Sequence, residues 1–174
     1  MSLSDAHAAD RAGSVESAAA RYEEVLAAGD YSLQVLLNLA LLYWQATDPG
    51  LAAAKNIGPD FLTRAGRRTP ELLEEATRLY PGSTAPRFWK RYIAWADLGE
   101  PLNVEECRQL LREDPAVLIP AMHVFAVSQG RDMKKEAHEL LQQCRENGTT
   151  GARYAVSVIE GVMKRTGQHQ GEPR

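Results

Sequence analysis

Three pairs of adjacent glutamates are the first residues of this sequence that invite an acid–base interpretation. They are Glu23-Glu24, Glu74-Glu75 and Glu105-Glu106. Two carboxylates share the work of a general acid and a general base only when both side chains reach the same bond. Neighbouring residues of a helix point in different directions and do not converge on one atom. Each pair falls in a segment expected to be helical, so we predict solvated helix faces and no catalytic residues.

The histidines and cysteines lack the spacing of a metal site. No two of the four histidines are four residues apart, and Cys107 and Cys144 are separated by 37 residues. Structural and catalytic zinc sites use patterns such as HExxH or paired CxxC, so we predict no bound metal and no cofactor. His123 and His138 fall in neighbouring expected helices, and we interpret them as surface or boundary residues. We expect both thiols to be buried, reduced and unreactive.

Composition and motifs argue against several other functions. No P-loop or GxGxxG motif is present, and residues 148–151 are expected to form a turn. The net charge is −3, whereas a surface that follows phosphates is usually strongly basic. The longest apolar run, 35–44, has about half the length of a membrane span, and the first residues do not resemble a signal peptide. We therefore expect a cytoplasmic protein that is not an enzyme and binds neither nucleic acid nor membranes.

The rest of the sequence predicts an all-α fold. Helix-forming stretches alternate with turn residues, and strand patterns are nearly absent. The expected helices cover about 14–28, 32–46, 51–55, 59–65, 69–80, 84–98, 103–113, 116–128, 132–146 and 151–165. Helices of this length joined by short turns are typical of antiparallel helix pairs.

The expected helices form a single domain, residues 14–166. The flanking segments 1–13 and 167–174 are small and polar, and we expect them to be disordered. Inside the domain, residues 51–68 have a less regular pattern, with Gly58 and Pro59 interrupting any continuous helix. We predict an irregular half-repeat there.

The turn residues recur at a fixed spacing. Pro81, Pro115 and Thr149 each lie between two expected helices, and successive members are separated by 34 residues. Asp30 precedes Pro81 by 51 residues, which is one and a half repeats. A constant period of this length is typical of stacked helical units.

The residues between these turns resemble the tetratricopeptide repeat (TPR) family. With Asp30 at position 32 of the repeat, the family's small, large and aromatic positions hold Ala18, Tyr22, Leu36, Leu39, Ala40 and Tyr43. The match is closest over residues 18–43 and weakens toward the C-terminus, where Phe125 occupies a small position. The resemblance implies antiparallel helix pairs stacked as a right-handed solenoid with a concave groove. The alternative is an irregular helical bundle.

That implied groove supplies the candidate partner-binding residues. Asn38 and Trp44 face the groove in the closest frame, and Trp89 and Arg91 border it in the frame set by Pro81. A one-residue shift of that second frame places three other aromatic residues of the helix in the core: Phe88, Tyr92 and Trp95. In both frames an aromatic side chain lies beside a basic one, which suits an apolar anchor with an acidic flank on the partner.

We expect a non-catalytic protein–protein interaction module that binds a protein or peptide partner in its groove. A narrower form of this expectation is a sequestering or neutralising partner of one specific protein. The alternatives are a structural homo-oligomeric helical protein and a subunit of an enzyme complex. A second candidate site is the cluster of Arg64, Arg67 and Arg68 near Phe61, which suits an anion or an acidic partner unless it is an exposed loop. The partner and the oligomeric state stay open.

Overall fold

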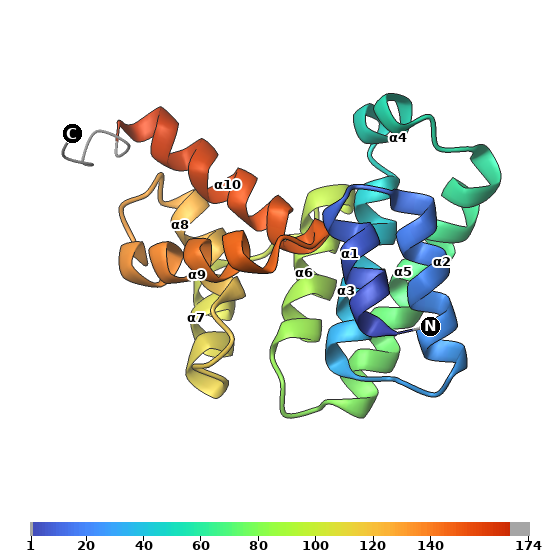
Figure 1. Cartoon of the computed structure of the whole chain (residues 1–174). Helices are drawn as coiled ribbons and strands as arrows, with labels where there is room; N and C mark the ends of the chain where they lie inside the picture. The colour runs from blue at the N-terminus through green and yellow to red at the C-terminus, as the bar shows by residue number, and fades with distance from the viewer. Residues whose placement is uncertain (1, 168–174) are drawn as a thin grey trace. The chain divides into compact units, whose positions relative to one another are not determined.

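A computed structural model describes residues 2–167, and every regular element in this range is an α-helix (Figure 1). The prediction of an all-α fold is confirmed, since no strand occurs among these residues. Ten helices follow one another within residues 2–167: α1 (Leu3–Arg11), α2 (Val15–Ala27), α3 (Leu33–Ala46), α4 (Pro49–Lys55), α5 (Pro59–Leu79), α6 (Ala85–Leu98), α7 (Val104–Glu113), α8 (Ile119–Val127), α9 (Lys134–Asn147) and α10 (Thr150–Thr166).

The expected single domain is divided into two compact units. The first consists of residues 2–81 and 149–151, and the second of residues 82–148 and 152–167. The division falls at the Pro81-Gly82 turn, which in the sequence looks like every other turn between expected helices. Residues 168–174, most of the expected disordered tail, lie outside the described part of the chain.

Helix α3 forms the centre of the first unit. Its residues are apolar on almost every side, so it is buried from several directions, with Val35, Leu36, Leu39 and Tyr43 fully covered. It packs most extensively against α5 and also against α2 and α4. This arrangement places the end of α2 and the start of α3 beside the second half of α5, where the pocket described below is found.

The expectation of a disordered start is wrong, because residues 3–11 form α1. Ser2 and Asp5 cap this helix reciprocally: the Ser2 hydroxyl accepts from the Asp5 amide, and the Asp5 carboxylate accepts from the Ser2 amide. Ala6 and Asp10 are buried. The buried Asp10 carboxylate accepts hydrogen bonds from the Tyr22 hydroxyl and from the amide and hydroxyl of Thr150. These bonds hold α1 against the rest of the first unit, although α1 has no stripe of buried apolar residues.

The predicted break before Thr69-Pro70 is also wrong, since α5 runs without interruption through Pro70. The buried residues of α5 form one stripe at helical spacing: Phe61, Ala65, Thr69, Leu72, Leu73 and Ala76. Pro70 and Gly66 lie on the exposed side of the helix, where water can satisfy the carbonyl that Pro70 leaves without a donor. Packing of the buried stripe against α3 therefore outweighs the local cost of proline. The segment 51–68 consists of α4, a connection at residues 56–58 and the start of α5.

The second unit is organised around α8. This helix contacts α6, α7 and α9 and buries Met122, His123, Val124 and Phe125. Asn103 caps α7, because its side chain accepts a hydrogen bond from the Glu106 amide at 2.7 Å. The aromatic side chains of α6 pack among themselves and against His123 and Tyr154.

Candidate functional site

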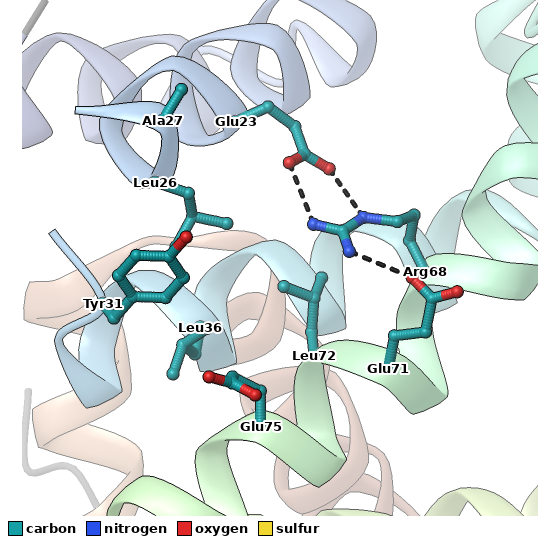
Figure 2. Close-up of a pocket in the computed structure, with 9 residues that line it drawn as sticks. All are labelled: Glu23, Leu26, Ala27, Tyr31, Leu36, Arg68, Glu71, Leu72 and Glu75. Atoms are coloured by element: carbon teal, nitrogen blue, oxygen red, sulfur yellow. Dashed lines mark hydrogen bonds and ion pairs between the residues drawn. The ribbon is translucent and has the colours of Figure 1, made fainter. Parts of the chain in front are cut away.

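The first unit contains a pocket of about 460 Å³ between α2, α3 and α5 (Figure 2). Such a volume lies in the usual range of ligand-binding pockets. The lining comes from the end of α2, the turn after it, the start of α3 and the second half of α5: Glu23, Leu26, Ala27, Tyr31, Leu36, Arg68, Glu71, Leu72 and Glu75. Because all nine residues belong to the first unit, the pocket is complete within it.

The turn between α2 and α3 sets the open side of this pocket. Gly29 adopts a positive φ of 94°, which side chains disfavour, and so reverses the chain directly after α2. The Asp30 carboxylate accepts from the Ser32 amide at 2.9 Å and fixes the next residues. The Tyr31 carbonyl accepts from the Tyr80 hydroxyl at 3.0 Å, which ties the turn to the end of α5. As a result, the Tyr31 ring stands at the rim of the pocket with 46% of its surface exposed.

Apolar side chains form the floor. Leu26, Leu36 and Leu72 are each no more than 5% exposed, and they come from three different helices. Ala27, at the end of α2, is exposed and leaves the entrance open. Above this buried floor, the Tyr31 ring and the exposed Ala27 offer apolar surface to a ligand that enters from solvent.

A polar network closes the other side of the pocket. The Arg68 guanidinium donates from Nε and Nη2 to the two carboxylate oxygens of Glu23, each at 3.0 Å, and from Nη1 to Glu71 at 3.0 Å (Figure 2). The Tyr43 hydroxyl donates to the same Glu23 carboxylate at 3.0 Å. Burial, together with the Glu23 charge, raises the pKa of Tyr43 to about 12. The bonds to Glu23 raise the pKa of Arg68 further above its usual value, so the guanidinium stays charged and fixed.

Three carboxylates and one guanidinium line the pocket, which gives the lining alone a formal charge of −2. Two arginines outside the lining, Arg67 and Arg78, pair with Glu71 and Glu75 and offset this charge. Glu23 already accepts from Arg68 with both oxygens, whereas Glu71 and Glu75 lie one turn apart along α5 at the solvent side. Glu71 is at the Arg68 end of the pocket and Glu75 is at the Tyr31 end (Figure 2). Their other ionic partners, Arg67 and Arg78, are 71% and 64% exposed.

The residues predicted to bind a partner are not those of the pocket. Asn38 and Trp44 are buried, at 9% and 7% exposure, and the Asn38 amide is hydrogen-bonded to His7 Nε2 at 3.0 Å. Trp89 is 4% exposed and packs against Phe88, Tyr92 and Tyr154. These three side chains therefore lack the exposed surface that the groove interpretation required.

The fourth predicted residue, Arg91, is partly exposed but occupied. Its guanidinium donates to Glu106, Glu100 and the Pro101 carbonyl, all in the second unit. The exposed tryptophan of α6 is Trp95, at 38%. The shifted repeat frame correctly predicts that Phe88 and Tyr92 are core residues. The same frame buries Trp95 and leaves Trp89 at the surface, and both of these predictions are wrong.

Of the predicted basic cluster, only Arg68 reaches the pocket. Arg64 lies over the Phe61 ring with 5.1 Å to its centroid, and Arg67 points toward Glu71 on the exposed side of α5. The cluster is helical and is not an exposed loop. The pocket is not evident from the sequence because Glu23 and Arg68 are 45 residues apart. The sequence does show a tyrosine, Tyr31, directly after the Gly29-Asp30 turn, and two carboxylates at i, i+4 spacing, Glu71 and Glu75.

The two cysteines of the described residues lie outside the pocket and are not exposed. Cys107 and Cys144 are buried as expected, and burial raises their thiol pKa values to about 12 and about 11. Within residues 2–167, no group of His, Cys, Asp and Glu side chains has the arrangement of a metal site. No helix in the same range is long and apolar enough to cross a membrane. Comparisons with protein-family models, curated proteins and solved structures find no match to this chain.

Proposed function

We propose that this chain is a non-catalytic interaction protein that binds a segment of a protein partner in the pocket of the first unit. The observation that carries the proposal is the combination of an apolar floor, an exposed tyrosine at the rim and carboxylates at the solvent side of one pocket. An apolar anchor surrounded by polar groups is the usual anatomy of a protein-recognition site. This location replaces the groove residues predicted from the repeat frame.

The proposal retains a TPR-like arrangement of helix pairs. It is supported by the spacing of 34 residues between turns and by the packing of successive helices within each unit, namely α1 with α2, α2 with α3, α7 with α8 and α8 with α9. Stacked pairs of this kind hold an extended or helical peptide against side chains from several helices. A right-handed solenoid and a cytoplasmic location belong to the same proposal.

Selection of random linear peptides displayed against the whole chain tests the proposed function. The selected peptides are then titrated into chain labelled at leucine and valine methyl groups. Binding in the pocket is expected to shift the methyl resonances of Leu26, Leu36 and Leu72, which line it. Val127 and Leu98, exposed in the second unit, serve as reference positions. Peptides that shift the second-unit resonances and leave the pocket leucines unchanged would place binding elsewhere.

A second candidate function is self-association, which corresponds to the homo-oligomeric alternative. Trp95 and Leu98 lie one turn apart on α6 and are 38% and 74% exposed. Exposed apolar residues at this spacing favour a helix-to-helix contact between copies. Sedimentation equilibrium of the wild type and of Leu98→Glu distinguishes the two cases: a mass that falls to the monomer value in the variant supports self-association, and a monomeric wild type rejects it.

A further inference from the structure

We infer that the pocket of the first unit takes a basic side chain of the partner segment, next to an apolar residue of that segment. This inference rests on the proposed function and names the chemistry of the partner. Its geometric basis is the position of two partly exposed carboxylates, Glu71 and Glu75, which are separated by one turn of α5 and line the pocket together (Figure 2).

The three carboxylates that line the pocket differ in how many hydrogen bonds and ion pairs they already form. Glu23 is a structural partner, because it accepts two bonds from Arg68 and one from Tyr43 and is only 33% exposed. Glu71 gives one oxygen to Arg68 at 3.0 Å, and its other oxygen has Arg67 at 4.0 Å. A 4.0 Å contact with a side chain that is 71% exposed contributes little. Glu71 therefore retains acceptor capacity toward the pocket.

Glu75 has one ionic partner among the described residues, Arg78, which donates to it from the following turn of α5. Arg78 is 64% exposed, so this pair is solvated and exchanges easily with another cation. A guanidinium in the pocket meets Glu71 as well as Glu75, because both line it, and the second carboxylate adds to its attraction. Arg78 is thus a competitor that the ligand displaces.

The shape of the pocket suits a long basic side chain. Its aliphatic stem can lie against Ala27 and the Tyr31 ring, above the buried leucines, while its charged head remains at the carboxylates near solvent, as Lys and Arg commonly do. The exposed Tyr31 ring at the rim offers a face for stacking of a planar guanidinium. For that reason we expect arginine to bind more tightly than lysine. An acidic segment, which the predicted basic cluster would have favoured, meets a net negative lining and is repelled.

Two probe peptides test this inference on the full chain. One carries a single arginine between two leucines, and the other carries citrulline in place of arginine, which keeps the shape and removes the charge. Binding is measured by the leucine methyl shifts of the pocket. We expect the arginine peptide to bind at least about fivefold more tightly than the citrulline peptide, the scale of one or two solvated charge contacts.

Variants of α5 separate the charge effect from folding. The Glu71→Gln/Glu75→Gln double variant should lose the preference for arginine, whereas Glu74→Gln, on the same helix but outside the lining, should keep it. Arg78→Gln should tighten binding of the arginine peptide, a gain that a damaged fold does not produce.

Two results would overturn the inference. Equal affinity for both probes, with shifts at the pocket leucines, would leave the proposed function standing and remove the charge preference. Absence of pocket shifts with either probe would reject a basic occupant, and the display selection would then decide the proposed function independently.

Discussion

Arg68 on α5 holds the carboxylate of Glu23 on α2 through two parallel hydrogen bonds of 3.0 Å, and this pair forms one side of the pocket. The two residues are 26% and 33% exposed, so the interaction is partly shielded from water. Paired bonds between a guanidinium and a carboxylate are geometrically specific and stronger than neutral hydrogen bonds. The same pair that shapes the pocket therefore also links two helices of the first unit.

Replacement of Arg68 tests this structural role. In Arg68→Ala, Glu23 keeps only the Tyr43 hydroxyl among these partners, and we expect the free energy of unfolding to fall by about 1–3 kcal/mol. Urea denaturation of the variant and the wild type measures the difference. Arg67→Ala, which removes a side chain that is 71% exposed, should change it by less than about 0.5 kcal/mol. Equal effects of the two substitutions would show that the Arg68 network contributes no special stability.

Removal of the Asp10 carboxylate tests the anchoring of α1. Asp10→Ala leaves the buried donors of Thr150 and Tyr22 without their acceptor, and we expect a loss of about 2–4 kcal/mol of unfolding free energy. Asp5→Ala is the matched control, since Asp5 is an exposed capping residue of the same helix whose loss should cost about 1 kcal/mol or less. A change of the Asp10 variant no larger than that of the control would contradict the assigned role.

Burial of His123 predicts a pH dependence of stability. The ring is 1% exposed, Nε2 donates to the Leu102 carbonyl at 3.0 Å, and Nδ1 has no hydrogen-bond partner among the described residues. Burial lowers the pKa of His123 below its ordinary value of 6.5, although the bond to Leu102 and the charge of Glu106 partly oppose this. The unfolded chain then binds the proton more tightly than the folded chain does. The stabilisation is complete above pH 6.5 and is lost as the pH falls below it, at no more than about 1.4 kcal/mol per pH unit.

Denaturation at neutral pH and at about one pH unit below 6.5 measures this effect. In His123→Gln the loss of stability on acidification should be smaller than in the wild type. His138→Gln, which changes an exposed histidine of α9, should leave the acid loss unchanged. His7 is a second group whose pKa burial lowers, so part of the acid loss is expected to persist in the His123 variant. An identical pH profile in the His123 variant and the wild type would contradict the prediction.

Much of the helical pattern followed from the sequence, because caps and turn residues mark helix ends locally. The bounds of α3 and α6 agree with the expected segments to within one or two residues. The missed helix α1 depends instead on a buried carboxylate whose partner Thr150 is 140 residues away. Pro70 misled the interpretation of α5, since its cost depends on which side of the helix faces solvent. Neither fact can be read from neighbouring residues.

The candidate site was the least predictable feature, for a related reason. A one-residue change of repeat frame rotates a helix by about 100°, and neither frame places Trp89 in the core and Trp95 at the surface, where the structure has them. The weak repeat match around α6 does not determine the frame to that precision. The pocket itself requires Glu23 and Arg68 to meet across 45 residues. Sequence spacing therefore predicted the fold class and did not predict which surface is open.

Obstruction of the pocket is the most direct test of the claim that the first unit binds its partner there. The measurement is the dissociation constant of a peptide from the display selection, determined by calorimetry for the wild type, Ala27→Trp and Ala28→Trp. Both alanines are exposed at the end of α2, but only Ala27 lines the pocket. We predict that Ala27→Trp weakens binding by about tenfold or more and that Ala28→Trp leaves it within about twofold. Unchanged affinity in Ala27→Trp would contradict the account.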